Sequence, residues 1–367
     1  MQKTLMQGLT EVDMQAVVNS YNLNDYYYPT LFPIQQTNSL TWKSLEINTG
    51  LHLAADVVAR GNSIAQKSRE ALTRLQGDIP KIAVKRVMEE DELNEYKMLL
   101  ALTQGNGDKQ RLIEAWANDT DFCWNGIASR IEWMALRSIS TGKLRFTHQN
   151  NVGPVSEFDL DYQLGSKRSG YNTGSASWAN PATAKPITVD LRQTVERARA
   201  KGIRLRYAFM NTATFAEFAA TDEVVKMCSS YLVNAVNGAY MPDIDQVNST
   251  LGKIAYLHGL QIRVIDQQIT LEMEDGSRMD ENPFVDNSVL LSESAVLGNT
   301  HWVTPIDMSM RGTAAIAVMN GHTCIKKYST DEPVTEVTMG IANAFPGWAS
   351  SQRSYLIDTH NSNWNIN

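Results

Sequence analysis

The stretch KLRFTHQNNVGPVSEFDLDYQ, residues 143–163, alternates polar and apolar residues on both sides of the segment NNVGP, residues 150–154. If the chain folds back at that segment, each basic residue faces an acid and the apolar residues face one another. The predicted pairs are Lys143 with Asp161, Leu144 with Leu160, Arg145 with Asp159, Phe146 with Phe158, and Thr147 with Glu157. Matched cross-strand pairs stabilise a sheet by roughly 0.2–1 kcal/mol each. The stretch therefore predicts a long β-hairpin, whose candidate contact residues are Arg145, Phe146, Phe158 and Asp159.

A long helix is predicted immediately before this hairpin. Its apolar residues fall near one stripe at helical spacing: Leu112, Trp116, Cys123, Ile127, Ile131, Met134 and Ala135. Gly142 follows the stripe and suits the residue that ends a helix. We predict a helix over residues 108–140, which at 1.5 Å per residue is roughly 50 Å long. That length is unusual for a compact domain.

Two charge blocks lie before this helix. Residues 57–88 hold seven basic residues against two acids, and residues 89–100 hold five acids against one lysine. The basic segment is strand-like but polar, which predicts a protruding two-stranded loop over residues 51–88. The candidate contact residues of the loop are Arg60, Lys67, Arg69, Arg74, Lys81 and Lys85, and the candidate acceptors are Glu89, Glu90, Asp91 and Glu92. Such blocks are commonly solvated faces, but opposite charges also set register between subunits.

The remaining chain divides by composition. Residues 1–40 are polar and tyrosine-rich, which indicates an arm that needs a partner surface to lie on. A segment rich in Gly, Ser, Ala and Pro, residues 164–186, marks a domain boundary. Beyond it the pattern alternates helices and strands, and an acidic hairpin is predicted around Asp275 and Gly276 within residues 267–287. Two further strands are expected in residues 331–360.

Catalytic motifs are absent from the sequence. It contains no P-loop, no GxGxxG after a predicted strand, and no HExxH or GxSxG motif. The cysteines Cys123, Cys228 and Cys324 are odd in number and far apart, which suits buried residues in a reducing cytoplasm. The six histidines show no metal-ligand spacing. We expect no catalytic, cofactor-binding or metal-ligating residues.

Composition narrows the function further. The chain has 367 residues with 43% hydrophobic content and a net charge of −7. This charge disfavours bulk nucleic-acid binding, which depends on neutralising phosphates. No apolar run is long enough to span a membrane, and the start does not look like a secretory signal. These features favour a structural or interaction protein. An α/β enzyme with its site in residues 187–325 remains an alternative.

The order of these segments resembles the major capsid proteins of tailed phages with the Hong Kong 97-type fold, and most closely the lambda-type major head protein family. YYYPTLFP resembles the family's N-terminal arm, the segment 53–87 its extended loop, and the long helix its spine helix. GKLRFTHQ and VSEFDLDYQ are similar to the hairpin after the spine. PFVDNSVLLSESAVLGN resembles a strand of the axial domain, although Val285 stands where proline is expected. The match covers nearly the whole chain.

The resemblance implies an α+β capsid fold with a defined set of domains. They are an N-terminal arm and lead-in strand at 1–50, an extended β-loop at 51–88, a peripheral domain at 89–186, an axial domain at 187–325, and a C-terminal return to the peripheral domain at 326–367. The peripheral domain would hold the spine helix 108–140 and the hairpin 143–163.

The implied function is self-assembly into pentamers and hexamers of an icosahedral shell around double-stranded DNA. The shell would form in the host cytoplasm and become the virion capsid. Its partners would be portal, scaffolding and decoration proteins, without membrane, cofactor or sequence-specific DNA contact. The short arm favours a separate scaffolding protein. An encapsulin-type compartment shell is an alternative with the same fold. Some relatives crosslink a loop lysine to an asparagine, but nothing in the sequence favours Lys67 and Asn343 for this.

Overall fold

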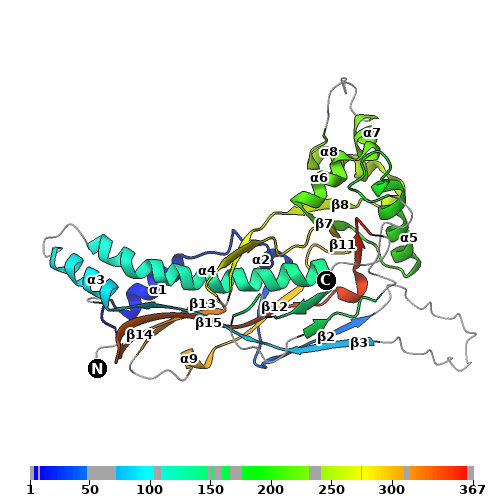
Figure 1. Ribbon diagram of the computed structural model, residues 1–367. Coiled ribbons are helices and arrows are strands. Elements are labelled where there is room, and N and C mark those ends of the chain that lie inside the picture. Colours follow the sequence, from blue (N-terminus) through cyan, green and yellow to red (C-terminus); the bar gives the residue numbers. More distant parts are fainter. Residues whose placement is uncertain are drawn as a thin grey trace, which may run out of the picture. The chain divides into compact units, whose positions relative to one another are not determined.

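The computed structural model describes residues 4–6, 9–47, 72–102, 109–147, 150–152, 159–165, 176–230, 241–273, 275–309 and 315–361, and it has the mixed α+β composition predicted from the sequence (Figure 1). The chain forms two compact units. Unit 1 comprises Met1–Trp42, Gly77–Met134 and Asn299–Gly347, and unit 2 comprises Lys43–Gln76, Ala135–Gly298 and Trp348–Asn367.

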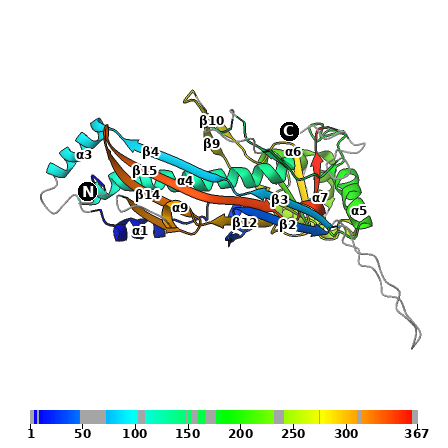
Figure 2. The same ribbon diagram turned by 90° about the horizontal axis from the view of Figure 1, so that it is seen from below.

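Unit 1 is built on a sheet of six strands. Its elements are α1 (Glu11–Ser20), α2 (Tyr28–Leu31), β1 (Ile34–Gln36), β4 (Lys81–Met88), α3 (Glu90–Leu102), most of α4 (Lys109–Thr141), β12 (Gly298–Val303), α9 (Ile306–Ser309), β13 (Ile316–Asn320), β14 (Thr323–Asp331) and most of β15 (Val334–Trp348). The strand order is β1-β12-β15-β14-β13, and β4 also pairs with β15. Figure 2 shows β4, β15 and β14 running side by side.

Helices α1 and α4 cover one face of this sheet. Their buried residues Met14, Val18, Cys123 and Trp124 form one cluster with Ile316, Val318 and Ile325 of the sheet. The helix α4 comes very close at Gly340 in β15, where an added Cβ would lie 2.7 Å from the carbonyl oxygen of Cys123. Because Gly340 has no side chain, the helix packs directly on the backbone of β15 at this position. The short helix α9 lies on the other face.

The observed α4 confirms the predicted helix 108–140 within one residue at each end. The described members of its apolar stripe, from Trp116 to Ala135, are buried. The helix ends where Gly142 takes a φ of +74°, a conformation that L-residues avoid. A Cβ at this position would also lie 2.7 Å from Leu164. Both observations explain why glycine ends the helix.

The described residues of unit 2 form a second sheet and the helices α5 to α8, together with shorter elements. Its elements are most of β2 (Thr41–Ile47) and of β3 (Leu72–Asp78), the end of α4, β5 (Lys143–Arg145), β6 (Asp159–Asp161), a π-helix (Pro186–Leu191), α5 (Arg192–Ala200), β7 (Tyr207–Asn211), α6 (Thr212–Ala220), α7 (Asp222–Ser230), α8 (Ile244–Lys253), a 3-10 turn (Ala255–Leu257), β8 (Gln261–Ile265), β9 (Ile269–Glu272), β10 (Arg278–Glu281), β11 (Ser288–Ser292), a 3-10 turn (Ser351–Arg353) and β16 (Tyr355–Asp358).

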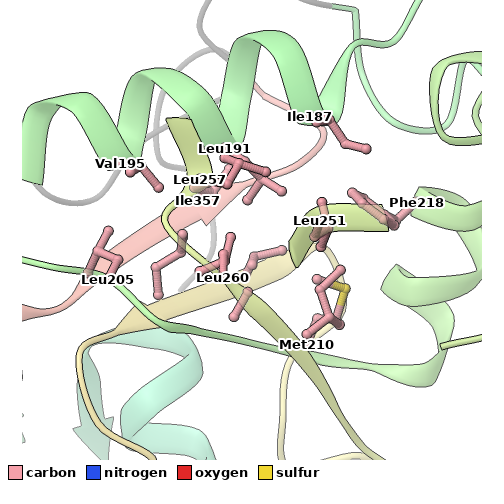
Figure 3. Close-up of a cluster of buried hydrophobic side chains, with 14 of the residues drawn as sticks. Ile187, Leu191, Val195, Leu205, Met210, Phe218, Leu251, Leu257, Leu260 and Ile357 are labelled. Atoms are coloured by element: carbon pink, nitrogen blue, oxygen red, sulfur yellow. The ribbon is translucent and has the colours of Figure 1, made fainter. Parts of the chain in front are cut away.

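The main sheet of unit 2 has the order β16-β11-β7-β8, with β7 and β8 parallel. One face of it packs against the helices in a core that includes Leu191, Met210, Phe218, Leu251 and Ile357 (Figure 3). Three two-stranded pairs accompany it, β2–β3, β5–β6 and β9–β10.

One side chain occupies part of the outer edge of this sheet. Strand β8 is the last in its sheet, so one row of its backbone groups has no neighbouring strand. The side-chain amide of Asn248, on α8, accepts from the Ile262 amide at 2.7 Å and donates to the Ile262 carbonyl at 3.0 Å. Asn248 therefore replaces a paired strand at this position.

Two helical segments of unit 2 are interrupted. Within residues 212–228, Thr221 takes an extended conformation and separates α6 from α7. The helix α8 ends at Lys253, and a 3-10 turn follows. The helix α5 closes at Gly202, which has a φ of +75°.

Candidate assembly surfaces

The hairpin after α4 has the predicted register. Lys143 pairs with Asp161, Leu144 with Leu160, and Arg145 with Asp159. The ammonium of Lys143 lies 3.8 Å from Asp161, and the guanidinium of Arg145 lies 3.8 Å from Asp159, all on exposed side chains. Leu144 is buried and anchors the opposite face. Exposed pairs of this kind add little to stability, so they are available for contacts outside the chain.

Farther from the helix, the hairpin departs from the prediction. The carbonyl of Thr147 accepts from the amides of Asn150 and Asn151 at 3.1 and 3.0 Å, which is a local turn. The expected partners of Phe146 and Thr147, Phe158 and Glu157, lie outside the described residues. Phe146 itself is half-buried.

The basic segment is only partly within the described chain. Arg60, Lys67 and Arg69 lie outside the described residues, and of Arg74 only the backbone, in β3, is described. Lys81 and Lys85 lie on β4, which pairs with β15 from Lys81 opposite Asn343 to Met88 opposite Glu336. The prediction that this part protrudes as a loop is therefore wrong. Alternate residues of β4 face α4, and the two lysines face the other side of the sheet. The lysines on that side made the sequence of this segment look too polar for a buried strand.

Lys81 already has a partner in its own chain. Its ammonium lies 3.3 Å from Asp307 on α9, and Lys326 of β14 lies 3.0 Å from the same carboxylate. These two hydrogen-bonded cations lower the pKa of Asp307, against a desolvation effect that raises it. The bridge holds α9 against the sheet. Lys85 is exposed and belongs to no ion pair among the described residues.

The acids Glu89, Glu90, Asp91 and Glu92 are all exposed around the first turn of α3. The Glu89 amide donates to the Glu92 carboxylate at 3.3 Å. Acids at this position stabilise the positive end of a helix, which gives them a local role. They belong to no ion pair among the described residues, so they stay candidate acceptors for a neighbouring subunit.

The tyrosine-rich arm lies on its own chain. The amides of Tyr27 and Tyr28 donate to the two carboxylate oxygens of Glu132 at 2.9 and 2.7 Å, and the Tyr28 hydroxyl lies 2.9 Å from Nε2 of His322. Tyr28, Phe32 and Leu31 are buried. The surface that the arm needs is therefore provided by α4 and the β13–β14 turn, and no second subunit is required for residues 9–36.

Burial shifts the charges at this site. Desolvation raises the pKa of Glu132 to about 7, although the two amide donors favour the ionised form. Desolvation also lowers the pKa of His322 to about 4. Both groups are therefore less charged at neutral pH than they would be in water.

A buried polar cluster at the other end of the sheet escaped the sequence analysis. Lys327 is fully buried, and its ammonium donates to the Thr338 hydroxyl at 2.7 Å. Desolvation lowers its pKa, while the nearby carboxylates of Glu336 and Asp119 act in the opposite direction. Glu336 also accepts from the Thr4 hydroxyl and from the Leu5 amide at 3.0 Å. Lys327 lies two residues after Ile325 and therefore on the same face of β14, and this spacing was an available signal.

Other kinds of site are not indicated. Within the described ranges, no group of three His, Cys, Asp or Glu side chains is placed to hold a metal ion. All three cysteines are buried and free, as predicted. In the same ranges, no helix has the length and hydropathy needed to cross a membrane.

The fold and these surfaces can be compared with known proteins. The model of the family described as phage major capsid protein E matches residues 11–349. The chain belongs to this family. The capsid protein is therefore a structural component of an icosahedral phage shell and not an enzyme, as the sequence predicted. A comparison with curated protein sequences finds no match.

Solved structures show the same fold. A prophage protein from Escherichia coli, described as its capsid protein, shares 14% identity and a TM-score of 0.59 over 95% of this chain and 99% of its own. A phage-related protein from Bordetella bronchiseptica shares 13% identity and a TM-score of 0.56 over 95% and 97%. The capsid of cyanophage A-1(L) shares 9% identity and a TM-score of 0.50 over 93% and 94%. The predicted Hong Kong 97-type capsid fold is confirmed.

Proposed function

We propose that this capsid protein assembles into pentamers and hexamers that close an icosahedral shell around double-stranded DNA. The family match over residues 11–349 carries the proposal, because it spans both compact units. Assembly would take place in the host cytoplasm and would involve portal and scaffolding proteins, with decoration proteins added to the finished shell.

The contacts between subunits would use the charged surfaces described above. The basic residues Arg60, Lys67, Arg69, Arg74 and Lys85 would bind the acids around the start of α3 in a neighbour, with Lys81 contributing where Asp307 leaves it accessible. The exposed charges of the hairpin β5–β6, Arg145 and Asp159, would form a second contact. Complementary charges of this kind set register between subunits.

The test is assembly of the chain alone and with the proteins encoded beside it. Size exclusion and negative-stain microscopy should show closed shells, tubes, or pentameric and hexameric rings. Shells purified from phage-producing cells should contain nuclease-protected double-stranded DNA. A monomer or dimer that never assembles with these partners would contradict the proposal, and shells that enclose protein cargo in place of DNA would favour a compartment.

A further inference from the structure

Unit 2 carries opposite charges at the two ends of its parallel strands. Arg204 and Arg206 lie in the extended segment that leads into β7, and both are exposed while the intervening Leu205 is buried. The guanidinium of Arg263, in β8, lies 4.9 Å from the ring of Tyr207, the first residue of β7. We call these three arginines the basic surface. None of them belongs to an ion pair among the described residues.

The acidic hairpin, β9–β10, follows the opposite end of the same strands. It begins after Ile265, the last residue of β8, and carries the exposed acids Glu272, Asp275 and Asp280 against one exposed arginine, Arg278. Hydrogen bonds from Ser277 lower the pKa of Asp275, which keeps that carboxylate charged at neutral pH. In Figure 2 the hairpin projects on the side of this unit away from α5, the helix before the basic surface.

The spacing prevents the two surfaces from neutralising each other within one copy. Strands β7 and β8 have five residues each and run parallel, so Arg204 and Arg206, before β7, lie about 16 Å along the strands from the end of β8 where the hairpin begins. Arg263 is in the middle of β8, but its guanidinium reaches back to the ring of Tyr207, at the start of β7. Charges this far apart on a solvated surface are largely screened. The hairpin also includes one exposed apolar side chain, Met279.

We infer that the basic surface of one copy binds the acidic hairpin of the next, so that identical head-to-tail contacts close the ring. Two different patches on one subunit generate a ring when the rotation between copies closes. This inference rests on the proposed function and specifies which part of unit 2 makes the contact. A second copy is favoured over DNA because the chain carries the complementary acids itself and has a net charge of −7.

The experiment reverses each surface and then both. The variant Arg204→Glu with Arg206→Glu and the variant Glu272→Lys with Asp280→Lys should each lower the assembled fraction by about tenfold or more, because like charges would then face each other. The chain that carries all four changes should recover assembly, since the contact is complementary again. A control with Lys185→Glu and Lys226→Glu lowers the charge of unit 2 by the same amount as the arginine variant, at exposed residues elsewhere, and should assemble normally.

Mixing the two single-surface variants gives a sharper result. Each contact between unlike variants is complementary, so alternating copies fit a ring with an even number of subunits. Hexamers should therefore form and pentamers should not. Circular dichroism and thermal unfolding would establish that every variant folds.

The outcomes separate this inference from the proposed function. If the wild-type chain never assembles, the proposed function fails. If the wild type and the Arg204 and Arg206 variant both assemble normally, only the inference is overturned. It is also overturned if that variant assembles but loses retention of DNA, because the basic surface would then bind nucleic acid. Failure of the four-change chain, once it is shown to be folded, would equally contradict a direct contact.

Discussion

Gly340 is a residue at which α4 and the sheet of unit 1 come into close contact. Its missing side chain leaves room for the backbone of Cys123, and an added Cβ would lie 2.7 Å from a carbonyl oxygen that cannot turn away. Cys123 itself is buried and donates its thiol toward the Thr338 carbonyl at 3.5 Å. The helix therefore cannot shift without breaking other contacts.

Replacing Gly340 with Ala should lower the free energy of unfolding by about 1–3 kcal/mol, the usual cost of overpacking a well-filled core. Urea titration measures the change. Gly252→Ala is the control, because a Cβ there meets nothing within 4 Å and alanine is the better helix former. Equal stability of Gly340→Ala and the wild type would show that α4 does not need this close approach.

The arm site makes stability depend on pH in two opposing ways. Glu132 has a pKa raised to about 7. Its contribution to the free energy of unfolding is therefore complete below the ordinary carboxyl range and is lost as pH rises through about 7. His322 has a pKa lowered to about 4, so its contribution is complete above its ordinary value of 6.5 and is lost as pH falls through about 4. Between these values the two slopes partly cancel.

Single substitutions should separate the pH dependence of stability that comes from Glu132 from the one that comes from His322. In Glu132→Gln, stability should rise with pH between about 4 and 6.5, the window of His322. In His322→Gln, stability should fall between about 4.5 and 7, the window of Glu132. Denaturant midpoints across this range test both, with the wild type as reference. Identical pH profiles for the two variants would rule out this assignment.

At the scale of elements, β4 has two roles, since one of its faces packs against α4 and the other presents lysines. Its Val84 side chain packs against Gly126 of α4 at 3.3 Å from an added Cβ, while Lys81 and Lys85 face the other side of the sheet. The strand is therefore a structural part of unit 1 that also presents basic side chains. Substitutions on its two faces should have separable effects.

Lys85→Glu should leave the free energy of unfolding within about 0.5 kcal/mol of the wild type, as expected for a surface change, and should reduce shell formation if Lys85 binds acids of a neighbour. Lys81→Glu is the comparison, because it also removes the contact with Asp307. Thermal unfolding and particle counts by microscopy measure the two effects. Normal shells from Lys85→Glu would exclude Lys85 from the proposed contact.

Local pattern accounts for the elements that the sequence predicted well. The β5–β6 register follows from neighbouring charges such as Arg145 and Asp159, and α4 follows from its stripe of apolar residues. The pairing of β4 with β15 joins segments far apart in the chain, and no local pattern encodes it. The same holds for Glu132, an acid within a helix whose partners lie in the arm, and for Lys327, whose buried environment is assembled from distant strands.

For the whole molecule, net charge limits the contact with nucleic acid. A chain with a net charge of −7 can neutralise few of the phosphates of DNA, even though it has a basic segment over residues 57–88. Enclosing DNA inside a closed shell requires no affinity of the free subunit for DNA.

The unassembled chain should therefore fail to retard double-stranded DNA in gels at about 0.15 M salt, where non-specific binders have dissociation constants of roughly 10⁻⁴–10⁻⁶ M. Charge-reversed Glu89→Lys with Glu90→Lys serves as a more basic comparison. Retardation by the wild-type chain at micromolar concentration would contradict the prediction and suggest that DNA helps to organise assembly.

Asn248 has a consequence for how the growth of an assembly stops. A ring or a shell is finished when its last contact closes, but strands that add edge to edge can continue without limit and give fibres. A protein produced in many copies and selected to bind itself meets this hazard at every bare strand edge. By occupying both backbone groups of Ile262, the amide of Asn248 makes this part of the β8 edge unavailable for pairing with a strand of another copy.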